Sequence, residues 1–297
     1  MTTTIRAAVP ADAAAVLALI HTTFGDRPVL DPPATAMEET LETVTAALEA
    51  HGGLVAERDG IAVGSLLLAP DGPLLGLRRV GVLKEARHHG VAHQLAAAAR
   101  EHAIAHGFTG LVLEARAELP DTVAFWERQG YVEVDRDGPR LRMVAAVPVT
   151  LTMPTAEDTR ALGERLGAEL GAGDLLILTG DLGAGKTTLT QGIGEGLGVR
   201  GPITSPTFVI ARVHPSLVGG PALIHVDAYR LGGAAELDDL DLDTDVDEAV
   251  TIVEWGSGLA ESLNEDRLEI AMTRAADDVR TITLTPHGRR WALVRLG

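Results

Sequence analysis

The first half of the chain alternates short apolar runs with segments of helical periodicity. Met37, Leu41, Val44 and Leu48 recur at helical spacing, and Asp59-Gly60 between two apolar runs is a strong hairpin signal. The segments predict the order β-α-α-β-β-β-α-β-α-β, an α/β layer in which helices cover a mostly antiparallel sheet. The predicted strands are 4–9, 53–58, 61–69, 74–83, 111–114 and one after residue 131, and the predicted helices are 12–21, 35–50, 94–106 and 121–129.

The second half begins with an amphipathic segment, 155–170, and continues as α/β. A buried strand at 175–179 is followed by a helix-like run at 187–197, and the later strands are predicted at 209–213, 222–227, 250–255, 268–272, 279–284 and 291–295. No long Gly/Ser linker separates the halves, and the boundary is placed near Pro148. We therefore predict two α/β domains, 1–147 and 151–297.

Between the strand at 175–179 and the next helix lies Gly180-Asp-Leu-Gly-Ala-Gly-Lys-Thr187, which matches the phosphate-loop pattern G-x-x-x-x-G-K-[ST]. Glycines let backbone N–H groups converge on phosphate oxygens, and the helix start adds its dipole. The pattern predicts that Lys186 reaches the β- and γ-phosphates of ATP and that the Thr187 hydroxyl contacts Mg²⁺. The predicted nucleotide-binding residues are Gly180, Asp181, Leu182, Gly183, Ala184, Gly185, Lys186, Thr187 and Thr188.

Lysine is rare in this chain. Of the 25 lysines and arginines only Lys84 and Lys186 are lysines, so a compact point charge has been kept where phosphate is expected. Two later strands end in carboxylates, Asp227 and Glu254, and parallel strands bring their carboxyl ends to one crevice. Either acid could bind Mg²⁺ while the other orients water, so Lys186, Asp227 and Glu254 are the predicted catalytic residues.

Four segments together resemble the bacterial TsaE ATPase family across residues 151–290: 180–187, Ser205-Pro-Thr-Phe208, His225-Val-Asp-Ala-Tyr-Arg-Leu231 and Glu254-Trp255. The resemblance implies an ATPase subunit for making threonylcarbamoyladenosine on tRNA, acting with a TsaB–TsaD pair that carries the transferase chemistry. It gives Asp227 a Walker-B-like role, makes Glu254 a second Mg²⁺ contact beside Thr187, and places Trp255 beside the site. Thr204, Ser205 and Thr207 would belong to a nucleotide-sensing switch loop.

The first half resembles a GNAT-type N-acetyltransferase over nearly all of residues 1–147. Arg87-x-x-Gly90-x-Ala92 precedes a helix, and Phe125-Trp-Glu-Arg-Gln-Gly-Tyr131 follows the next strand. In that family the backbone N–H groups of the loop hold the pyrophosphate of acetyl-CoA. The resemblance implies an acetyl-CoA site formed by Val82, Arg87, His88, His89, Gly90, Val91 and Ala92.

Two positions depart from the GNAT pattern. Ala92 replaces a usual glycine, and Trp126 stands where many relatives carry a tyrosine thought to protonate the leaving thiolate. An indole N–H cannot make that proton transfer. Glu114 is a candidate general base at a strand end. The acyl acceptor, and whether this half turns over or only binds the cofactor, stay open.

Charge and composition limit the kinds of partner and cellular location that we expect for this protein. The net charge of −17 divides into −6 over residues 1–147 and −11 over 148–297, so neither half suits tight contact with a nucleic-acid backbone, and tRNA is expected to be held by partners. Absence of cysteine excludes disulfides and thiolate metal sites. With no signal-peptide pattern and no apolar run near the ~20 residues of a membrane span, we predict a cytoplasmic protein without membrane contact.

One alternative function stays open, and one alternative interpretation of an acidic segment fails. A small P-loop kinase with an acetyl-CoA-sensing or inactive GNAT-like regulatory domain would phosphorylate an added metabolite and ignore protein partners. The acidic run 236–248 suggests a calcium loop, but counted from Asp241 it has Val246 at position 6 and Ile252 at position 12, so the EF-hand pattern fails. A solvated acidic face is the preferred interpretation of that run.

Overall fold

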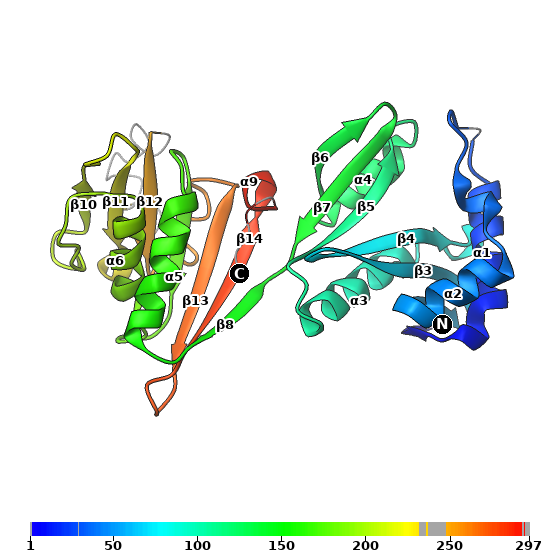
Figure 1. Ribbon diagram of the computed structural model, residues 1–297, viewed down its shortest axis with the longest axis horizontal. Coiled ribbons are helices and arrows are strands. Elements are labelled where there is room, and N and C mark those ends of the chain that lie inside the picture. Colours follow the sequence, from blue (N-terminus) through cyan, green and yellow to red (C-terminus); the bar gives the residue numbers. More distant parts are fainter. Residues whose placement is uncertain (1, 29, 232–235, 237–247, 293, 295–297) are drawn as a thin grey trace. The chain divides into compact units, whose positions relative to one another are not determined.

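The computed structural model describes residues 2–28, 30–231, 236, 248–292 and 294 (Figure 1). The chain divides into two compact units, Met1–Val147 and Pro148–Gly297. Among the described residues, no helix has both the length and the apolar character that crossing a membrane requires.

The first unit is built on a seven-stranded sheet of order β1-β2-β3-β4-β5-β7-β6. All neighbours pair antiparallel except β4 and β5, which confirms the predicted mostly antiparallel sheet. The strands are β1 (Thr3–Ala8), β2 (Gly53–Arg58), β3 (Ile61–Asp71), β4 (Leu74–Val82), β5 (Gly110–Arg116), β6 (Val132–Asp137) and β7 (Arg140–Ala146).

Helices cover both faces of this sheet: α1 (Ala13–Gly25), α2 (Leu41–His51), α3 (Val91–Ala105) and α4 (Pro120–Arg128) (Figure 1). Side chains of α1 and α2 form one core with Val55 and Leu67. Side chains of α3 and α4 form the other core, on the opposite face, with residues such as Leu66 and Leu113.

Three predictions for this unit need correction. The helix predicted from residue 35 begins at Leu41, because the Thr40 hydroxyl accepts a hydrogen bond from the Thr43 amide (3.2 Å), and residues 35–38 form a separate 3₁₀ turn. Helix α3 begins at Val91 rather than at 94. The single strand predicted after residue 131 is a hairpin, β6–β7, whose first strand is largely polar and exposed and so gives little apolar signal.

The sheet opens between β4 and β5. These strands pair only from Leu74–Gly76 to Gly110–Val112, and beyond that point no pairing between them continues. The register of β3 against β4 shifts between Ser65 and Leu67, and Arg79 adopts a φ of 54°. The two halves of the sheet therefore diverge, and a cleft lies where the strands part.

The second unit has a seven-stranded sheet of order β10-β11-β12-β9-β13-β14-β8, in which β11, β12, β9 and β13 run parallel. Its strands are β8 (Val149–Met153), β9 (Leu175–Thr179), β10 (Ala211–His214), β11 (Ala222–Asp227), β12 (Ala249–Glu254), β13 (Arg267–Arg274) and β14 (Arg280–His287). In β9, Leu176 and Leu178 face the core shared with the helices, while Leu175 and Ile177 face a second core. Together the two sheets confirm the predicted α/β class of both halves.

Helices α5 (Ala156–Glu169) and α6 (Lys186–Gly196) pack side by side on one face of this sheet (Figure 1). Glycines allow their backbones to meet: a Cβ on Gly192 would lie 2.0 Å from the Arg160 carbonyl oxygen, and one on Gly163 would lie 2.4 Å from that of Leu189. The close crossing fixes α6, and the predicted phosphate loop leads directly into the first turn of this helix.

Sequence periodicity also failed at several places here. The strand predicted at 291–295 is wrong in its described part, because Trp291 lies in helix α9 (Gly288–Ala292) and is buried. Strand β10 starts at Ala211 rather than 209, after Ile210 with a φ of 69°. Edge strand β8 lies at the junction between the domains, where the sequence pattern gives no strand bounds. The acidic run 236–248 lies outside the described residues except at its two ends.

Candidate functional site

The loop from Gly180 to Gly185 joins the end of β9 to the start of α6. Gly180 and Gly185 have φ values of 138° and 109°, which L-residues with a Cβ rarely adopt. A Cβ on Gly180 would also lie 2.2 Å from the Met272 carbonyl oxygen of β13. The loop thus lies in close contact with the sheet. Glycine is needed at Gly180 and Gly185 because of their positive φ, and at Gly180 also because there is no room for a Cβ. Of the remaining predicted nucleotide-binding residues, Leu182 is 94% exposed, whereas Lys186, Thr187 and Thr188 form the first turn of α6.

Lys186 is only 5% exposed. Its Nζ donates to the carbonyl oxygens of Gly180 (2.7 Å) and Asp181 (3.2 Å) and lies 3.9 Å from the centroid of the Trp255 ring. Burial lowers the pKa of Lys186, while Glu254 and Asp227 act in the opposite direction. The ammonium is held directly over the loop, which suits contact with a phosphate group bound there.

Glu254 and Asp227 are register partners at the carboxyl ends of β12 and β11, and both are buried. Glu254 Oε1 accepts a hydrogen bond from the Thr187 hydroxyl (3.1 Å) and lies 3.0 Å from His225 Nε2. Two hard oxygen donors, from Thr187 and Glu254, thus meet at the helix start. This pair fits the preference of Mg²⁺ for oxygen ligands.

Asp227 has different neighbours. Its Oδ2 accepts hydrogen bonds from the hydroxyls of Ser205 (2.9 Å) and Thr207 (2.5 Å), and its Oδ1 accepts one from the Tyr229 amide (3.1 Å). The third predicted switch-loop residue, Thr204, accepts a hydrogen bond from Arg212 (3.2 Å). Strand position alone left the two acids interchangeable, and only the family resemblance assigned Glu254 to Mg²⁺ beside Thr187. In the structure Glu254 bonds to Thr187, and Asp227 bonds to the predicted switch loop.

Three residues of this site carried no predicted role. His225 is fully buried beneath Glu254, two residues before Asp227 on the same strand. Arg274 and Arg280 are partners in the β13–β14 pair, and they border the phosphate loop: a Cβ on Gly183 would lie 3.4 Å from Arg274 Nη1, and one on Gly185 would lie 3.2 Å from Arg280 Nε. No motif marks these arginines, because only the pairing of β13 with β9 brings them to the loop.

The cleft of the first unit has a volume of about 1230 Å³. Of the residues predicted to bind acetyl-CoA, Val82, Arg87, His88 and Ala92 line it. Gly90, with a φ of 75°, precedes the first turn of α3. The first turn of a helix leaves backbone N–H groups without intrahelical partners, so this end of the cleft can hold an anion.

The remaining predicted residues are placed differently. The side chain of Val91 is buried in the core, and the His89 ring bonds through Nδ1 to the Arg87 carbonyl oxygen (2.8 Å). Val91 can therefore offer a ligand its backbone only, whereas the exposed His89 ring keeps Nε2 available. Glu114 is exposed and lines the cleft. Trp126 is 5% exposed, packs edge to face on Tyr131 with ring centroids 5.0 Å apart, and also lines the cleft.

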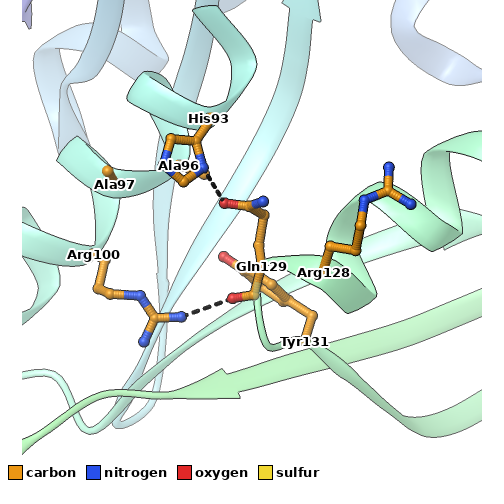
Figure 2. Close-up of a pocket in the computed structure, with 7 residues that line it drawn as sticks. All are labelled: His93, Ala96, Ala97, Arg100, Arg128, Gln129 and Tyr131. Carbon is orange, nitrogen blue, oxygen red and sulfur yellow. Dashed lines mark hydrogen bonds between the residues drawn. The ribbon is translucent and has the colours of Figure 1, made fainter. Parts of the chain in front are cut away.

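A second hollow of about 310 Å³ lies between α3 and the end of α4 (Figure 2). His93 and Arg100 reach from α3 toward Gln129: His93 Nδ1 lies 2.8 Å from its Oε1, and Arg100 donates to its carbonyl oxygen (3.0 Å). Arg100 also donates to the Ala146 carbonyl oxygen at the end of β7 (2.9 Å). These hydrogen bonds link α3 to the end of α4 and to the end of β7, so we assign the polar side chains around this hollow a structural role.

A parallel sheet whose central strand runs through a glycine loop into a helix, with a buried lysine and two buried acids at that edge, defines the second unit as a P-loop nucleotide-binding domain. Residues 153–282 match the family model described as threonylcarbamoyl adenosine biosynthesis protein TsaE, and residues 18–131 match that of the acetyltransferase (GNAT) family.

Curated relatives agree with the TsaE match. The tRNA threonylcarbamoyladenosine biosynthesis protein TsaE of Streptomyces coelicolor is 62% identical over 138 residues, covering 45% of this chain and 93% of the relative. That of Bacillus subtilis is 42% identical over 139 residues, covering 46% and 85%. A solved N-acetyltransferase from Thermoplasma acidophilum, in complex with coenzyme A, is 16% identical with a TM-score of 0.44, covering 49% of this chain and 99% of that one. The chain belongs to the TsaE family and joins its TsaE domain to a GNAT-family domain, as the sequence motifs predicted.

Proposed function

We propose that the second unit hydrolyses ATP in support of threonylcarbamoyladenosine formation on tRNA, together with a TsaB–TsaD-type protein pair. The observation that carries this proposal is the convergence of Lys186, Thr187 and Glu254 at one helix start. Lys186 would hold the β- and γ-phosphates, and Thr187 and Glu254 would hold Mg²⁺, which supplies charge neutralisation at the phosphates. His225 would keep the Glu254 carboxylate oriented.

Asp227 has a separate part in this proposal. It binds the hydroxyls of Ser205 and Thr207, so any movement of that loop on nucleotide binding breaks or remakes two hydrogen bonds to a buried carboxylate. A buried acid left without these donors loses stabilisation, which gives the loop two distinct states. We infer that this coupling reports the nucleotide state to the protein pair.

Phosphate release from ATP tests the first part. We expect slow turnover by the full chain alone and a faster rate when the cognate protein pair is added. Lys186→Ala should lower ATP turnover by about 100-fold or more, because it removes a positively charged hydrogen-bond donor that stabilises the reacting phosphate in the transition state. Lys84→Ala, which removes the other lysine, is the matched control and should leave ATP turnover unchanged. Equal rates with and without the pair would contradict the tRNA-modification role, and phosphate transfer to an added metabolite would favour the kinase alternative.

We propose further that the first unit binds acetyl-CoA, with its pyrophosphate at the start of α3, and transfers the acetyl group to an amine. Gly90 and the first-turn backbone of α3 support this, with Arg87 at the cleft wall. Trp126 is buried against Phe125 and Tyr131, and its indole cannot protonate a thiolate, so the departing CoA sulfur would take its proton from water.

Calorimetric titration of acetyl-CoA into the full chain tests this second part. The titration uses the Lys186→Ala background, because the nucleotide portion of CoA would otherwise compete for the phosphate loop. Arg87→Ala should weaken acetyl-CoA binding by about tenfold, the usual size of a lost charged hydrogen bond, whereas Arg136→Ala on exposed β6 should not change it. Absence of binding would refute the acetyl-CoA proposal, and binding without acetyl transfer to any acceptor would leave a sensor.

A further inference from the structure

Positive charge is concentrated in the cleft of the first unit. Residues 1–147 contain 13 basic and 19 acidic side chains. Eight of the 13 line this one cleft, all of them arginines, but only five of the 19 acids do. The cleft is therefore positive within a unit of net charge −6, and the concentration calls for an anionic occupant.

These arginines are not all on the side of the cofactor loop. In the β5–β7 pair, Arg116 lies opposite Arg140 and Glu114 lies opposite Arg142. Strand alternation places these four side chains on one face of the sheet. The intervening residues Leu113, Ala115, Leu141 and Met143 face the core that contains α3. Because Arg87–Ala92 leads into α3, the Arg116–Arg140–Arg142 row lies on the face opposite the cofactor loop.

The connection between α1 and α2 borders the same face. Arg116 donates to the carbonyl oxygens of Asp31 (2.9 Å) and Pro32 (2.8 Å), and Arg79 donates to Glu39 (2.7 Å). The arginine-lined part of the cleft therefore has a wall of its own, separate from α3 and α4. A substrate that meets the acetyl group from this side would contact arginines.

Some of the guanidinium groups already have acidic partners. Arg79 pairs with Glu39, Arg116 with Glu118 and Arg142 with Asp71. The guanidinium groups of Arg78 and Arg140 have no hydrogen-bond or ion-pair partner among the residues that the structure describes, although the charge of Arg78 helps to lower the pKa of Glu39, and both side chains line the cleft. Two guanidinium forks are thus available there for a carboxylate or phosphate, which they bind in bidentate fashion.

We propose that the acyl acceptor of this unit is an amine that carries an acidic group close to the reacting nitrogen, held by Arg78 and Arg140. The inference rests on the proposed acetyl transfer. In that step the neutral amine nitrogen forms a bond to the acetyl carbonyl carbon and the C–S bond of acetyl-CoA breaks. The amine loses one proton to water or to Glu114, and the CoA thiolate takes one from water, giving an amide and CoA. A polyamine or a lysine-rich tail would be repelled from the same surface.

The test compares acceptors of matched size with the full chain and acetyl-CoA. Three tripeptides begin with alanine and continue with two glutamates, two glutamines or two lysines. Free glutamate serves as a small acidic acceptor. We expect kcat/KM for amide formation, followed by mass spectrometry, to be at least about tenfold higher for the glutamate peptide than for the glutamine peptide, and lowest for the lysine peptide. A higher value for free glutamate than for the glutamate peptide would identify a small-molecule source of the same chemistry.

Variants locate the effect. Arg78→Gln and Arg140→Gln should each raise KM for the glutamate peptide about tenfold without changing the Kd of acetyl-CoA. Neither variant should change KM for the glutamine peptide. Arg136→Gln, on the same hairpin but outside the cleft, is the matched control. Weaker acetyl-CoA binding in Arg78→Gln and Arg140→Gln would overturn the inference by assigning these arginines to the phosphates of CoA.

Binding separates this inference from the proposed function. The glutamate peptide is titrated into the chain loaded with CoA, so the result does not depend on turnover. Binding that Arg140→Gln weakens supports the acidic acceptor even if Trp126 prevents catalysis. Bound CoA with no binding of the glutamate peptide, or with preferred binding of the lysine peptide, overturns it. Failure of the chain to bind CoA at all refutes the acetyl-CoA proposal instead.

Discussion

The two units use the same backbone device for different tasks. Each has a loop that leads into a helix through a glycine of positive φ, Gly90 at 75° before α3 and Gly185 at 109° before α6. Around Gly185 a buried lysine and two buried carboxylates converge, whereas Arg87, His88 and His89 beside Gly90 are exposed. Backbone N–H groups and a helix dipole are enough to hold a phosphate. Cleaving one also requires charges fixed where the transition state develops, which only the second loop has.

The loops also differ in how tightly they are held. A Cβ on Gly180 would meet the Met272 carbonyl oxygen at 2.2 Å, but the atom nearest to a Cβ on Gly90 would be Gln94 Nε2 at 3.8 Å. The phosphate loop is therefore fixed against the sheet, whereas the loop before α3, the proposed acetyl-CoA loop, has open space around Gly90. A loop that only binds tolerates adjustment, and a loop that positions reacting atoms does not.

The largest effect should come from making the same substitution in both loops. Gly180→Ala introduces a backbone clash as well as an unfavourable φ, so we expect ATP turnover to fall by about 100-fold or more. Gly90→Ala has only the unfavourable φ, which costs about 1–2 kcal/mol, and should weaken acetyl-CoA binding by roughly tenfold. Phosphate release and calorimetric titration measure the two outcomes.

The control for conformational strain alone is Gly60→Ala. Gly60 has a φ of 78° in the β2–β3 turn, and a Cβ there would meet nothing within 4 Å. It should lower stability without changing either activity. If Gly180→Ala kept its ATP turnover while Gly90→Ala lost acetyl-CoA binding completely, the proposed contrast between a fixed and an open loop would be wrong.

Local sequence signals anticipated much of this architecture. The phosphate-loop pattern and its flanking strand and helix are contiguous, so residues 175–197 specify their own conformation. Asp227 and Glu254 could be placed at one edge because parallel strands end together. Strand position could not tell what each acid contacts, since the partners Thr187 and Ser205 come from other segments; only the family resemblance placed Glu254 beside Thr187.

The residues that sequence reasoning missed share one property: their positions depend on pairing between distant segments. Arg274 and Arg280 reach the phosphate loop only through the pairing of β13 with β9 and β14. Arg140 lies opposite Arg116 in the β5–β7 register and lines the cleft of the first unit. Strand β6 was missed because an exposed edge strand needs few apolar residues.

The smallest effect concerns what holds each helix in place. Helix α3 packs side chains such as Leu95 and Ala99 onto its sheet, whereas α6 meets α5 backbone to backbone through glycines. Gly192→Ala would place a Cβ 2.0 Å from the Arg160 carbonyl oxygen, so we expect the second unit to lose about 1–3 kcal/mol of stability, a typical cost of overpacking.

Denaturant unfolding of the full chain, followed by hydrogen exchange in each unit, measures this loss. The matched control is Gly171→Ala, because a Cβ at Gly171 would meet nothing within 4 Å and its backbone has no positive φ. Exchange protection should fall in α5, α6 and β9 and stay unchanged in α3. Because α6 carries Lys186 and Thr187, ATP affinity should fall together with the stability of this helix pair. Unchanged affinity in a destabilised Gly192→Ala chain would show that the loop is held by β13 alone, through the contact of Gly180 with Met272.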